Sequence, residues 1–324
     1  MIDVLIAEAV SGPFVDALSA RFNVVRQPNL WEDQAALLKA TETARTLIVR
    51  NKTDVSAELL RAGKHLIGVG RAGVGLDNID LQCANELGVV VTCTPDQNSI
   101  SVAELVIGLM ISLARKIPAA TQDTSAGHWN RQQFTGTELY GKTFGIIGAG
   151  KIGFLAAMRA RALGMHILAY DPFVSEDNVL VREGQAELVD LDVLLSRADV
   201  VSCHVPGSPK TDGLINKERF AHMKPTAFFI NTARGQVVNE PDLIAALKAG
   251  KIAGAALDVR VAEPPKSSEL DKMPNVILTP HIAAFTHEAQ GRVTRVVCED
   301  IGRLLDGQPA RNVATRFSVP QKKT

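Results

Sequence analysis

Short apolar runs alternate with amphipathic stretches along most of the chain, and the alternation falls into two series. In the first series, the runs that suit strands are Val4–Ala7, Asn23–Arg26, Thr46–Arg50, Leu66–Val69 and Val89–Thr92. Helical spacing of apolar residues occurs at Phe14–Arg21, Ser56–Ala62 and Ser99–Arg115. The last of these helical patterns ends before Pro118. Such alternation predicts βαβ units, which build a mostly parallel sheet.

The second series begins at Thr143 and repeats the pattern. Its expected strands are Thr143–Ile147, His166–Tyr170, Val200–His204, Ala227–Asn231, Gly254–Leu257 and Val276–Leu278. Its expected helices are Ile152–Leu163, Leu191–Ser196, Pro241–Ala249 and Glu288–Leu305. The last helix has no strand after it, so it can return to pack on the first series, and Pro320–Thr324 look like a loose tail. The pattern predicts an α/β protein with two doubly wound parallel sheets.

Length, charge and cysteine content narrow the class of protein. The 324 residues suit two domains of about 150 residues each. The 35 basic and 35 acidic side chains cancel, so no overall field would attract nucleic acid or an anionic membrane. The start, MIDVLIAEAV, lacks the basic region of a signal peptide, and no apolar stretch is long enough to span a bilayer. The four cysteines form no CxxC pair and no metal spacing, so we expect reduced thiols, no metal and a cytoplasmic location.

A glycine motif opens the second series. Residues 143–171 read TFGIIGAGKIGFLAAMRARALGMHILAYD, in which Gly148, Gly150 and Gly153 fit G-x-G-x-x-G between an expected strand and an expected helix. These glycines permit a tight turn, the approach of a pyrophosphate to the helix N-terminus, and close packing of helix on strand. Asp171 would accept hydrogen bonds from ribose hydroxyls and repel a 2′-phosphate, which favours NAD over NADP. A plain glycine turn is the alternative, and the strand–helix–strand context disfavours it.

Three charged residues follow strands of the second series: Arg234 after AFFINTA, Glu263 after GAALDV and His281 after VILTP. Parallel strands end at a common edge of the sheet, where ligands bind. A histidine can remove a hydroxyl proton, a carboxylate can orient the imidazolium, and an arginine can hold a substrate carboxylate. Together these residues predict transfer of a hydride between a 2-hydroxy acid and nicotinamide. A surface ion pair, a solvated carboxylate and an ordinary strand-end histidine are the alternatives.

Further cofactor contacts are expected around the same edge. Asp258 closes the strand before Glu263 and suits either the nicotinamide carboxamide or the capping of its own loop. The other candidates lie within the glycine motif or at the ends of strands and just beyond them, and they are Lys151, Ile152, His204, Pro206 and Ala233.

The segments GIIGAGKIG, NTARGQVVNE, AALDV followed by EPP, and TPHIA resemble the D-isomer-specific 2-hydroxyacid dehydrogenases, and the resemblance covers essentially the whole chain. It implies a flavodoxin-like substrate domain at 1–97 and 288–324, with a Rossmann NAD-binding domain inserted at 98–287. It also implies that the arginine, glutamate and histidine of the family's active site are Arg234, Glu263 and His281. The nicotinamide contact would be Asp258, and a homodimer through the cofactor domain is expected.

A candidate substrate site follows strands of the first series. Gly73, Val74 and Gly75 can present backbone N–H groups to a carboxylate, although a tight glycine turn is an equal alternative. Arg50 and Arg71, with Lys52 near the first of them, would suit a second anionic group on the substrate. Each of these cations is, taken singly, more typical of a solvated surface.

The stretches VRNKT, GRAGVGLDNID, TPDQNSISVAEL and WNRQQFTGTEL are most similar to the family members that act on 3-phosphoglycerate. That resemblance implies that Arg50, Arg71 and also Arg131 face the phosphate, and a role in serine biosynthesis. A sulfonate such as sulfolactate would satisfy the same cations. The chain ends soon after its last helix, so we expect no C-terminal regulatory domain and no feedback by serine through one.

Two features depart from the family pattern near the reacting end. Arg260 stands where many relatives have an aromatic residue, and Ala283 and Phe285 stand where relatives often have glycine or small residues. The alternatives are a hydroxypyruvate or glyoxylate reductase and, from another class, an NAD(H)-sensing protein of the corepressor type. A formate dehydrogenase is disfavoured, because it would need glutamine in place of Glu263.

Overall fold

The computed structural model describes residues 1–315, and Pro320–Thr324, the expected tail, lie outside them. The chain divides into two compact units. The first unit holds Met1–Asn98 and the chain from Thr286 onward, and the second holds Ser99–Phe285. Within the described residues, no helix is both long and apolar enough to cross a membrane.

The first unit is built on a five-stranded parallel sheet in the order β2-β1-β3-β4-β5. The strands are β1 (Ile2–Ile6), β2 (Val24–Arg26), β3 (Ala44–Val49), β4 (Gly68–Arg71) and β5 (Val90–Thr92). This is the flavodoxin order. Side chains of β1 alternate between two cores, because Val4 and Ile6 contribute to one and Leu5 to the other.

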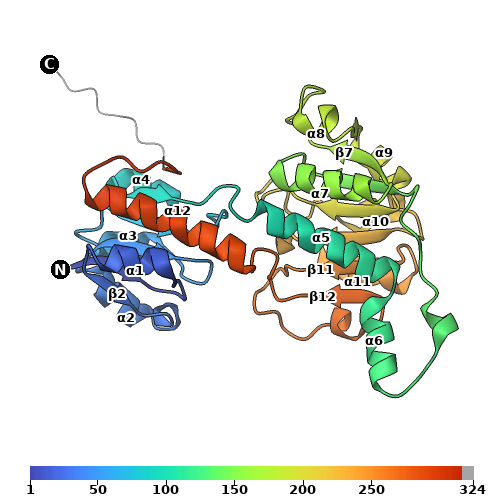
Figure 1. Cartoon of the computed structure of the whole chain (residues 1–324), viewed down its shortest axis with the longest axis horizontal. Coiled ribbons are helices and arrows are strands. Elements are labelled where there is room, and N and C mark those ends of the chain that lie inside the picture. Colours follow the sequence, from blue (N-terminus) through green and yellow to red (C-terminus); the bar gives the residue numbers. More distant parts are fainter. Residues whose placement is uncertain (316–324) are drawn as a thin grey trace. The chain divides into compact units, whose positions relative to one another are not determined.

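Helices cover both faces of this sheet. One core is completed by α1 (Pro13–Ser19) and α12 (His287–Leu305), and the other by α2 (Gln34–Thr41), α3 (Ala57–Ala62) and α4 (Leu81–Leu87). The last helix therefore does return to the first series, since α12 packs against α1, β3 and β4 (Figure 1).

The second unit contains a seven-stranded parallel sheet in the order β12-β11-β10-β9-β6-β7-β8. Its strands are β6 (Thr143–Ile147), β7 (His166–Tyr170), β8 (Glu187–Leu188), β9 (Val200–Cys203), β10 (Phe228–Asn231), β11 (Gly254–Leu257) and β12 (Val276–Leu278). Counted from β6, this is the Rossmann order with one strand added at the edge. The predicted fold class, two doubly wound parallel sheets, is confirmed.

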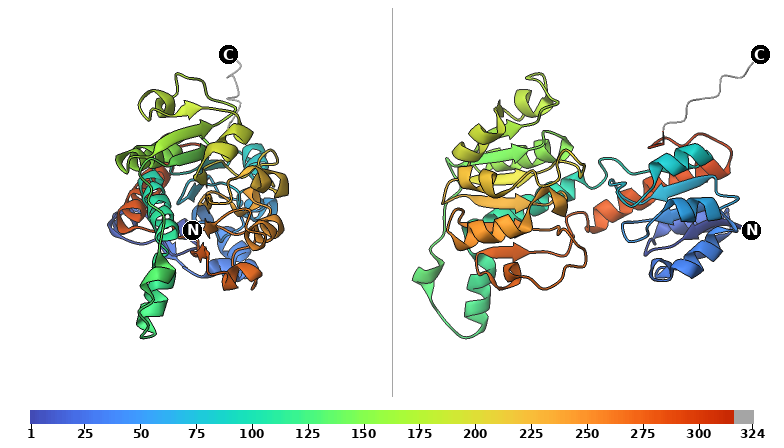
Figure 2. Two further views of the ribbon diagram at one scale, coloured as in Figure 1. Left: turned by 90° about the vertical axis from the view of Figure 1, so that its right-hand side faces the viewer. Right: turned by 180° about the vertical axis from the view of Figure 1, so that it is seen from behind.

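Two cores sandwich this second sheet. On one face lie α5 (Ser99–Ala114) and α7 (Lys151–Ala162), and on the other lie α9 (Leu191–Arg197), α10 (Lys217–His222) and α11 (Glu240–Lys248). The helix α6 (Ile117–Ser125) projects from the unit in every view (Figures 1 and 2), and none of its residues is buried.

Several short elements were not predicted. They are α2, α4, α6, α8 (Val179–Arg182), α10 and β8, together with the 3₁₀ turns Leu30–Glu32, Arg131–Phe134, Gly235–Val237 and Glu269–Lys272. Most span only two to eight residues, too few for an apolar period to emerge above the background. α6 is longer, but it buries no face, so its sequence carries no apolar stripe.

Candidate active site

The turn between β6 and α7 is shaped by its glycines. Gly148 adopts φ 104°, and a Cβ there would lie 2.8 Å from the backbone carbon of His204. A Cβ on Gly153 would lie 2.4 Å from the Gly148 carbonyl oxygen, so helix and strand are in direct contact. A Cβ on Gly150, by contrast, would meet no described atom within 4 Å. Gly150 also caps α7 without any side-chain hydrogen bond, so this open space faces helix N–H groups that suit an anion.

Asp171, just after β7, is joined to this turn. One carboxylate oxygen accepts a hydrogen bond from the Ala149 backbone N–H at 3.0 Å, and the other accepts one from the Phe173 N–H at 2.9 Å. The acidic residue of the motif is therefore held beside the glycine turn, and each oxygen keeps a lone pair for a further donor.

Two polar side chains near the strand ends have buried polar atoms with no hydrogen-bond partner among the described residues. Both ring nitrogens of His204, after β9, and the hydroxyl of Thr232, after β10, are shielded from solvent in this way. Burial lowers the pKa of His204 to about 4, so its ring is neutral near pH 7. Buried polar groups are normally satisfied. The open glycine turn and these unsatisfied atoms fit a dinucleotide ligand at the ends of β6, β9 and β10.

His281 and Glu263 form a hydrogen-bonded pair. The imidazole Nδ1 lies 2.6 Å from Glu263 Oε2, and about a third of each side chain is exposed (35% and 33%). Burial raises the pKa of Glu263, but the hydrogen bond and charge of His281, the Arg260 N–H and the charge of Arg234 together lower it below its usual value. Because Glu263 is then ionised near neutral pH, it accepts from Nδ1–H and leaves Nε2 of a neutral ring as an acceptor.

The backbone at His281 is held in an unusual conformation. His281 has φ 54°, a left-handed conformation that costs a non-glycine residue about 1 kcal/mol or more. Its N–H donates to the Asp258 carbonyl oxygen at 2.8 Å. The Asp258 carboxylate accepts from the Thr279 hydroxyl at 2.6 Å and from the backbone N–H groups of Ile282 and Ala283 at 2.9 Å each.

Asp258 thus caps the turn after β12 that carries His281, not its own loop after β11. The residue is only 1% exposed, and three hydrogen bonds already use its carboxylate. Contact with the nicotinamide stays a prediction. The two residues near His281 that depart from the family pattern differ in exposure: Ala283 is buried and Phe285 is 56% exposed.

Arg234 follows β10 in a turn held by Asn231. The Asn231 side chain accepts from the Ala233 N–H at 3.0 Å and donates to the Arg234 carbonyl oxygen at 2.9 Å. The guanidinium of Arg234 donates to the Ala233 carbonyl oxygen at 2.7 Å, and its charge lowers the pKa of Glu263. The second unit therefore places Arg234, Glu263 and His281 on neighbouring strand ends, β10, β11 and β12.

Of the cations predicted to face the anionic tail, Arg50, Lys52 and Arg71 lie in the first unit. After β3, the buried Glu8 carboxylate accepts the backbone N–H groups of Arg50 at 2.7 Å, Lys52 at 3.2 Å and Thr53 at 3.0 Å. Burial lowers the pKa of Arg50, and the charge of Glu8 opposes that effect. The Lys52 ammonium lies over the Trp31 ring, 4.2 Å from its centroid. The loop backbone is thus fixed by Glu8, which the sequence did not single out.

After β4, Arg71 folds over the glycine turn. Its guanidinium donates to the Ala72 carbonyl oxygen at 3.1 Å, and a Cβ on Gly73, at φ 156°, would overlap Arg71 Nη1 at 1.3 Å. Val74, between the two glycines, is 42% exposed. In the second unit, Arg131 opens an exposed 3₁₀ turn, Arg131–Phe134.

Residues 107–283 match the family model described as the D-isomer specific 2-hydroxyacid dehydrogenase, NAD binding domain. This match covers more than half of the chain, and the chain therefore belongs to the D-isomer-specific 2-hydroxyacid dehydrogenase family. The predicted family and the predicted NAD cofactor are confirmed.

Curated relatives carry a more particular description. The chain is 44% identical over 317 residues to the D-3-phosphoglycerate dehydrogenase of Archaeoglobus fulgidus, covering 98% of this chain and 60% of that protein. It is 46% identical over 288 residues to the D-3-phosphoglycerate dehydrogenase of Methanocaldococcus jannaschii, covering 89% of this chain and 55% of that protein. The chain thus spans 55 to 60% of the length of these relatives.

Solved structures share the fold over the whole length. The TT0316 protein of Thermus thermophilus superimposes with a TM-score of 0.91 at 33% identity, covering 97% of this chain and 100% of that one. This agreement supports the fold described above.

Proposed function

We propose that the protein is an NAD-dependent dehydrogenase that interconverts a D-2-hydroxy acid with an anionic tail and its 2-keto acid, with 3-phosphoglycerate as substrate. The observation that carries the proposal is the 2.6 Å hydrogen bond between His281 Nδ1 and Glu263 Oε2. These residues follow β12 and β11, and Arg234 follows β10, the next strand of the sheet. The names of the curated relatives support the choice of 3-phosphoglycerate.

His281 would act as the acid and base of the reaction. During oxidation, its Nε2 accepts the proton of the substrate 2-hydroxyl as the C–H bond on the same carbon breaks and the carbonyl forms. NAD, when bound, supplies the acceptor for the hydride that leaves this carbon. Glu263 stabilises the imidazolium that results, and Arg234 holds the substrate carboxylate with two hydrogen bonds. In the reductive direction the same imidazolium returns its proton to the carbonyl oxygen.

The cofactor would lie along the ends of β6, β7, β9 and β10. The glycine turn and the first residues of α7 would contact the pyrophosphate, and Asp171 the ribose hydroxyls. His204 and Thr232 have the unsatisfied polar atoms for the remaining polar contacts. The other proposed contacts are Lys151, Ile152, Pro206, Ala233 and Asp258.

In the first unit, Gly73, Val74 and Gly75 would bind the substrate carboxylate, and Arg50 and Arg71 its anionic tail. Residues 1–97 with 288–324 would then form the substrate domain and residues 98–287 the cofactor domain. We further propose a cytoplasmic homodimer. The projecting helix α6 supports this assembly, because Ile117 is 45% exposed and Trp129, just beyond the helix, is 78% exposed.

A panel of substrates tests the proposal. The protein would be mixed with NAD and 3-phosphoglycerate, sulfolactate or D-glycerate, and with NADH and hydroxypyruvate or glyoxylate, while NADH absorbance is followed. The highest kcat/KM is expected with 3-phosphoglycerate. A preference for sulfolactate or for the short keto acids would replace the substrate but keep the class of enzyme. Tight NADH binding without turnover of any member would support the NAD(H)-sensing alternative and contradict the enzyme proposal.

A further inference from the structure

The loop that carries Glu263 has little to hold it in place by itself. Between β11 and the 3₁₀ turn Glu269–Lys272 it forms no regular structure, and residues 261–267 are all exposed. Exposed irregular segments are the least stable parts of a fold. A general base that depends on a carboxylate in such a loop therefore needs a separate anchor.

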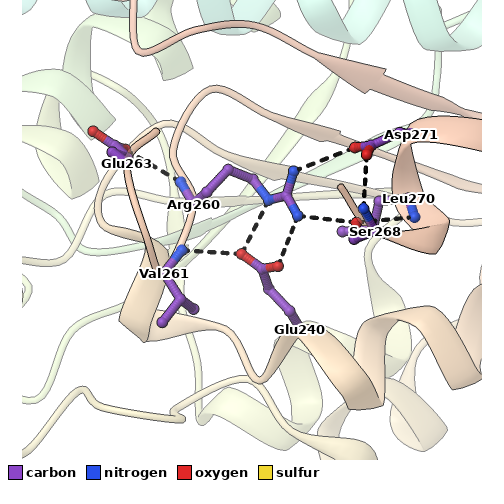
Figure 3. Close-up of polar contacts among 7 residues, drawn as sticks. All are labelled: Glu240, Arg260, Val261, Glu263, Ser268, Leu270 and Asp271. Carbon is purple, nitrogen blue, oxygen red and sulfur yellow. Dashed lines mark hydrogen bonds and ion pairs between the residues drawn. The ribbon is translucent and has the colours of Figure 1, made fainter. Parts of the chain in front are cut away.

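Arg260 provides the buried point of this loop. It is 8% exposed, and its guanidinium donates two hydrogen bonds to Glu240, from Nε to Oε1 at 3.0 Å and from Nη2 to Oε2 at 2.9 Å (Figure 3). The same Nη2 donates to the Ser268 hydroxyl at 3.1 Å, and Nη1 lies 3.7 Å from Asp271 Oδ1. One arginine thus joins both ends of the loop to the first residue of α11.

The backbone next to Arg260 completes the connection to the site. Glu240 Oε1 also accepts the Val261 N–H at 3.0 Å, so the helix carboxylate holds the loop backbone as well as the arginine side chain. On the other side, the Arg260 N–H donates to Glu263 Oε1 at 3.2 Å (Figure 3). Since Glu263 uses its second oxygen for His281, both oxygens of the carboxylate are held by hydrogen bonds.

The loop that carries Arg234 is packed against the same peptide. A Cβ on Gly235 would lie 2.0 Å from the Arg260 carbonyl carbon and 2.4 Å from the Val261 nitrogen. Any displacement of the 260–261 peptide therefore affects the neighbour of Arg234 as well as Glu263.

We propose that Arg260 is a positioning residue, whose ion pair with Glu240 fixes the backbone at 260–261 and so directs the Glu263 carboxylate at His281. The inference rests on the proposed function for the meaning of that alignment in catalysis. The charges explain why an arginine suits this position: Glu240 and Glu263 both approach one short stretch of backbone, and the buried guanidinium is compensated by the partly buried Glu240 carboxylate.

The test uses two variants and a matched control. Arg260→Met removes the guanidinium and keeps much of the volume, and Glu240→Gln removes only the partner's charge. Arg197→Met is the control, because Arg197 makes an equally bidentate pair with Glu187, at 2.6 and 2.7 Å, on an exposed surface elsewhere in the same unit. Arg260→Lys asks whether charge alone is sufficient, since lysine cannot reproduce the planar pairing.

Arg260→Met is expected to lower kcat about ten- to a hundredfold, with a small change in the KM for NADH, because a misplacement of about 1 Å has effects of this size. Glu240→Gln should lower kcat in the same direction, and the double variant should be no worse than the poorer single one. Arg197→Met should keep wild-type kcat. Wild-type kcat in Arg260→Met, or equal losses in Arg260→Met and Arg197→Met, would overturn the proposal.

A second readout does not depend on turnover. The imidazole C2–H signal of His281, assigned by its disappearance in His281→Gln, would be followed by NMR against pH in the whole protein. In Arg260→Met and Glu240→Gln the titration midpoint should move to lower pH, because a misdirected Glu263 stabilises the imidazolium less. A midpoint unchanged in both variants overturns the positioning role even if the protein proves inactive on every substrate. A shifted midpoint in a protein without turnover would contradict the proposed function and leave the positioning role standing. Far-ultraviolet circular dichroism identifies a variant that fails to fold, and the other variant then carries the test.

Discussion

A carboxylate anchors one loop of the proposed site in each unit, but in different ways. In the first unit, Glu8 accepts three backbone N–H groups from residues 50–53 and pairs with no side chain of that loop in these hydrogen bonds. In the second unit, Glu240 accepts one backbone N–H and forms a bidentate pair with the Arg260 side chain. The loop that carries Arg50 and Lys52 is held by the carboxylate of Glu8. The loop that carries Glu263 is held by the Glu240 carboxylate together with the Arg260 guanidinium.

The difference suits two proposed roles, substrate binding for the first loop and catalysis for the second. The first loop is proposed to bind the anionic tail of the substrate, and the charge of its buried anchor Glu8 opposes the effect of burial on the pKa of Arg50. The second loop must hold a carboxylate and a histidine in hydrogen-bond contact, which demands closer control of geometry. Variants of the second loop should therefore act on kcat, and variants of the first on substrate preference.

The largest effect is expected at His281. His281→Ala removes the proposed acid and base, and turnover should fall by about 10²–10⁴-fold, the usual contribution of such a group. Binding of NADH, measured by fluorescence, should change little, because the glycine turn and Asp171 are untouched. Near-normal kcat in this variant would show that His281 is not the acid and base of the reaction. It would also contradict the catalytic role proposed for the second loop.

A smaller but selective effect is expected in the first unit. Arg50→Ala and Arg71→Ala should each lower kcat/KM for 3-phosphoglycerate about ten- to a hundredfold, because hydrogen bonds to charged groups contribute about 1.5–3 kcal/mol. The value for D-glycerate, which lacks the phosphate, should change far less. Equal losses on both substrates would show that these arginines do not contact the anionic tail.

The anchor of the first loop can be broken separately. Glu8→Ala leaves three backbone N–H groups without their acceptor and should lower the free energy of unfolding by about 1–3 kcal/mol. Urea titration measures this loss, and kinetics should show a raised KM for 3-phosphoglycerate with kcat kept. Glu8→Gln, which retains one acceptor oxygen, is the matched control and should lose less. A fall in kcat without any change in KM would contradict the division of roles.

Sequence reasoning reached the parts of the site that follow from strand order. Glu263 and His281 are separated along the chain, yet each follows a parallel strand, so their meeting at one edge could be anticipated and the structure shows the hydrogen bond. The pairing of Arg260 with Glu240 could not, because Glu240 stands just before the expected helix Pro241–Ala249 and nothing in the sequence selects it among the acidic residues. The same holds for Glu8, because its three backbone hydrogen bonds depend on the conformation of the loop 50–53 that follows β3.

The smallest expected effect is on how the free energy of unfolding changes at acid pH, and it concerns Glu240, the anchor of the second loop. Burial raises the pKa of Glu240, but the hydrogen bonds from Arg260 and Val261 and the charge of Arg260 lower it overall, below its ordinary value of 4.5. A carboxyl group with a lowered folded pKa contributes stability above its ordinary pKa and loses that contribution as the pH falls through the folded value, because the unfolded chain then binds the extra proton. Urea unfolding between about pH 3 and pH 6 should therefore show a shallower acid loss in Glu240→Gln than in the wild type. An identical slope in both proteins would mean that the Arg260–Glu240 pair contributes nothing to stability, and the anchor of the second loop would then have to be sought in Ser268 and the Gly235 contact instead.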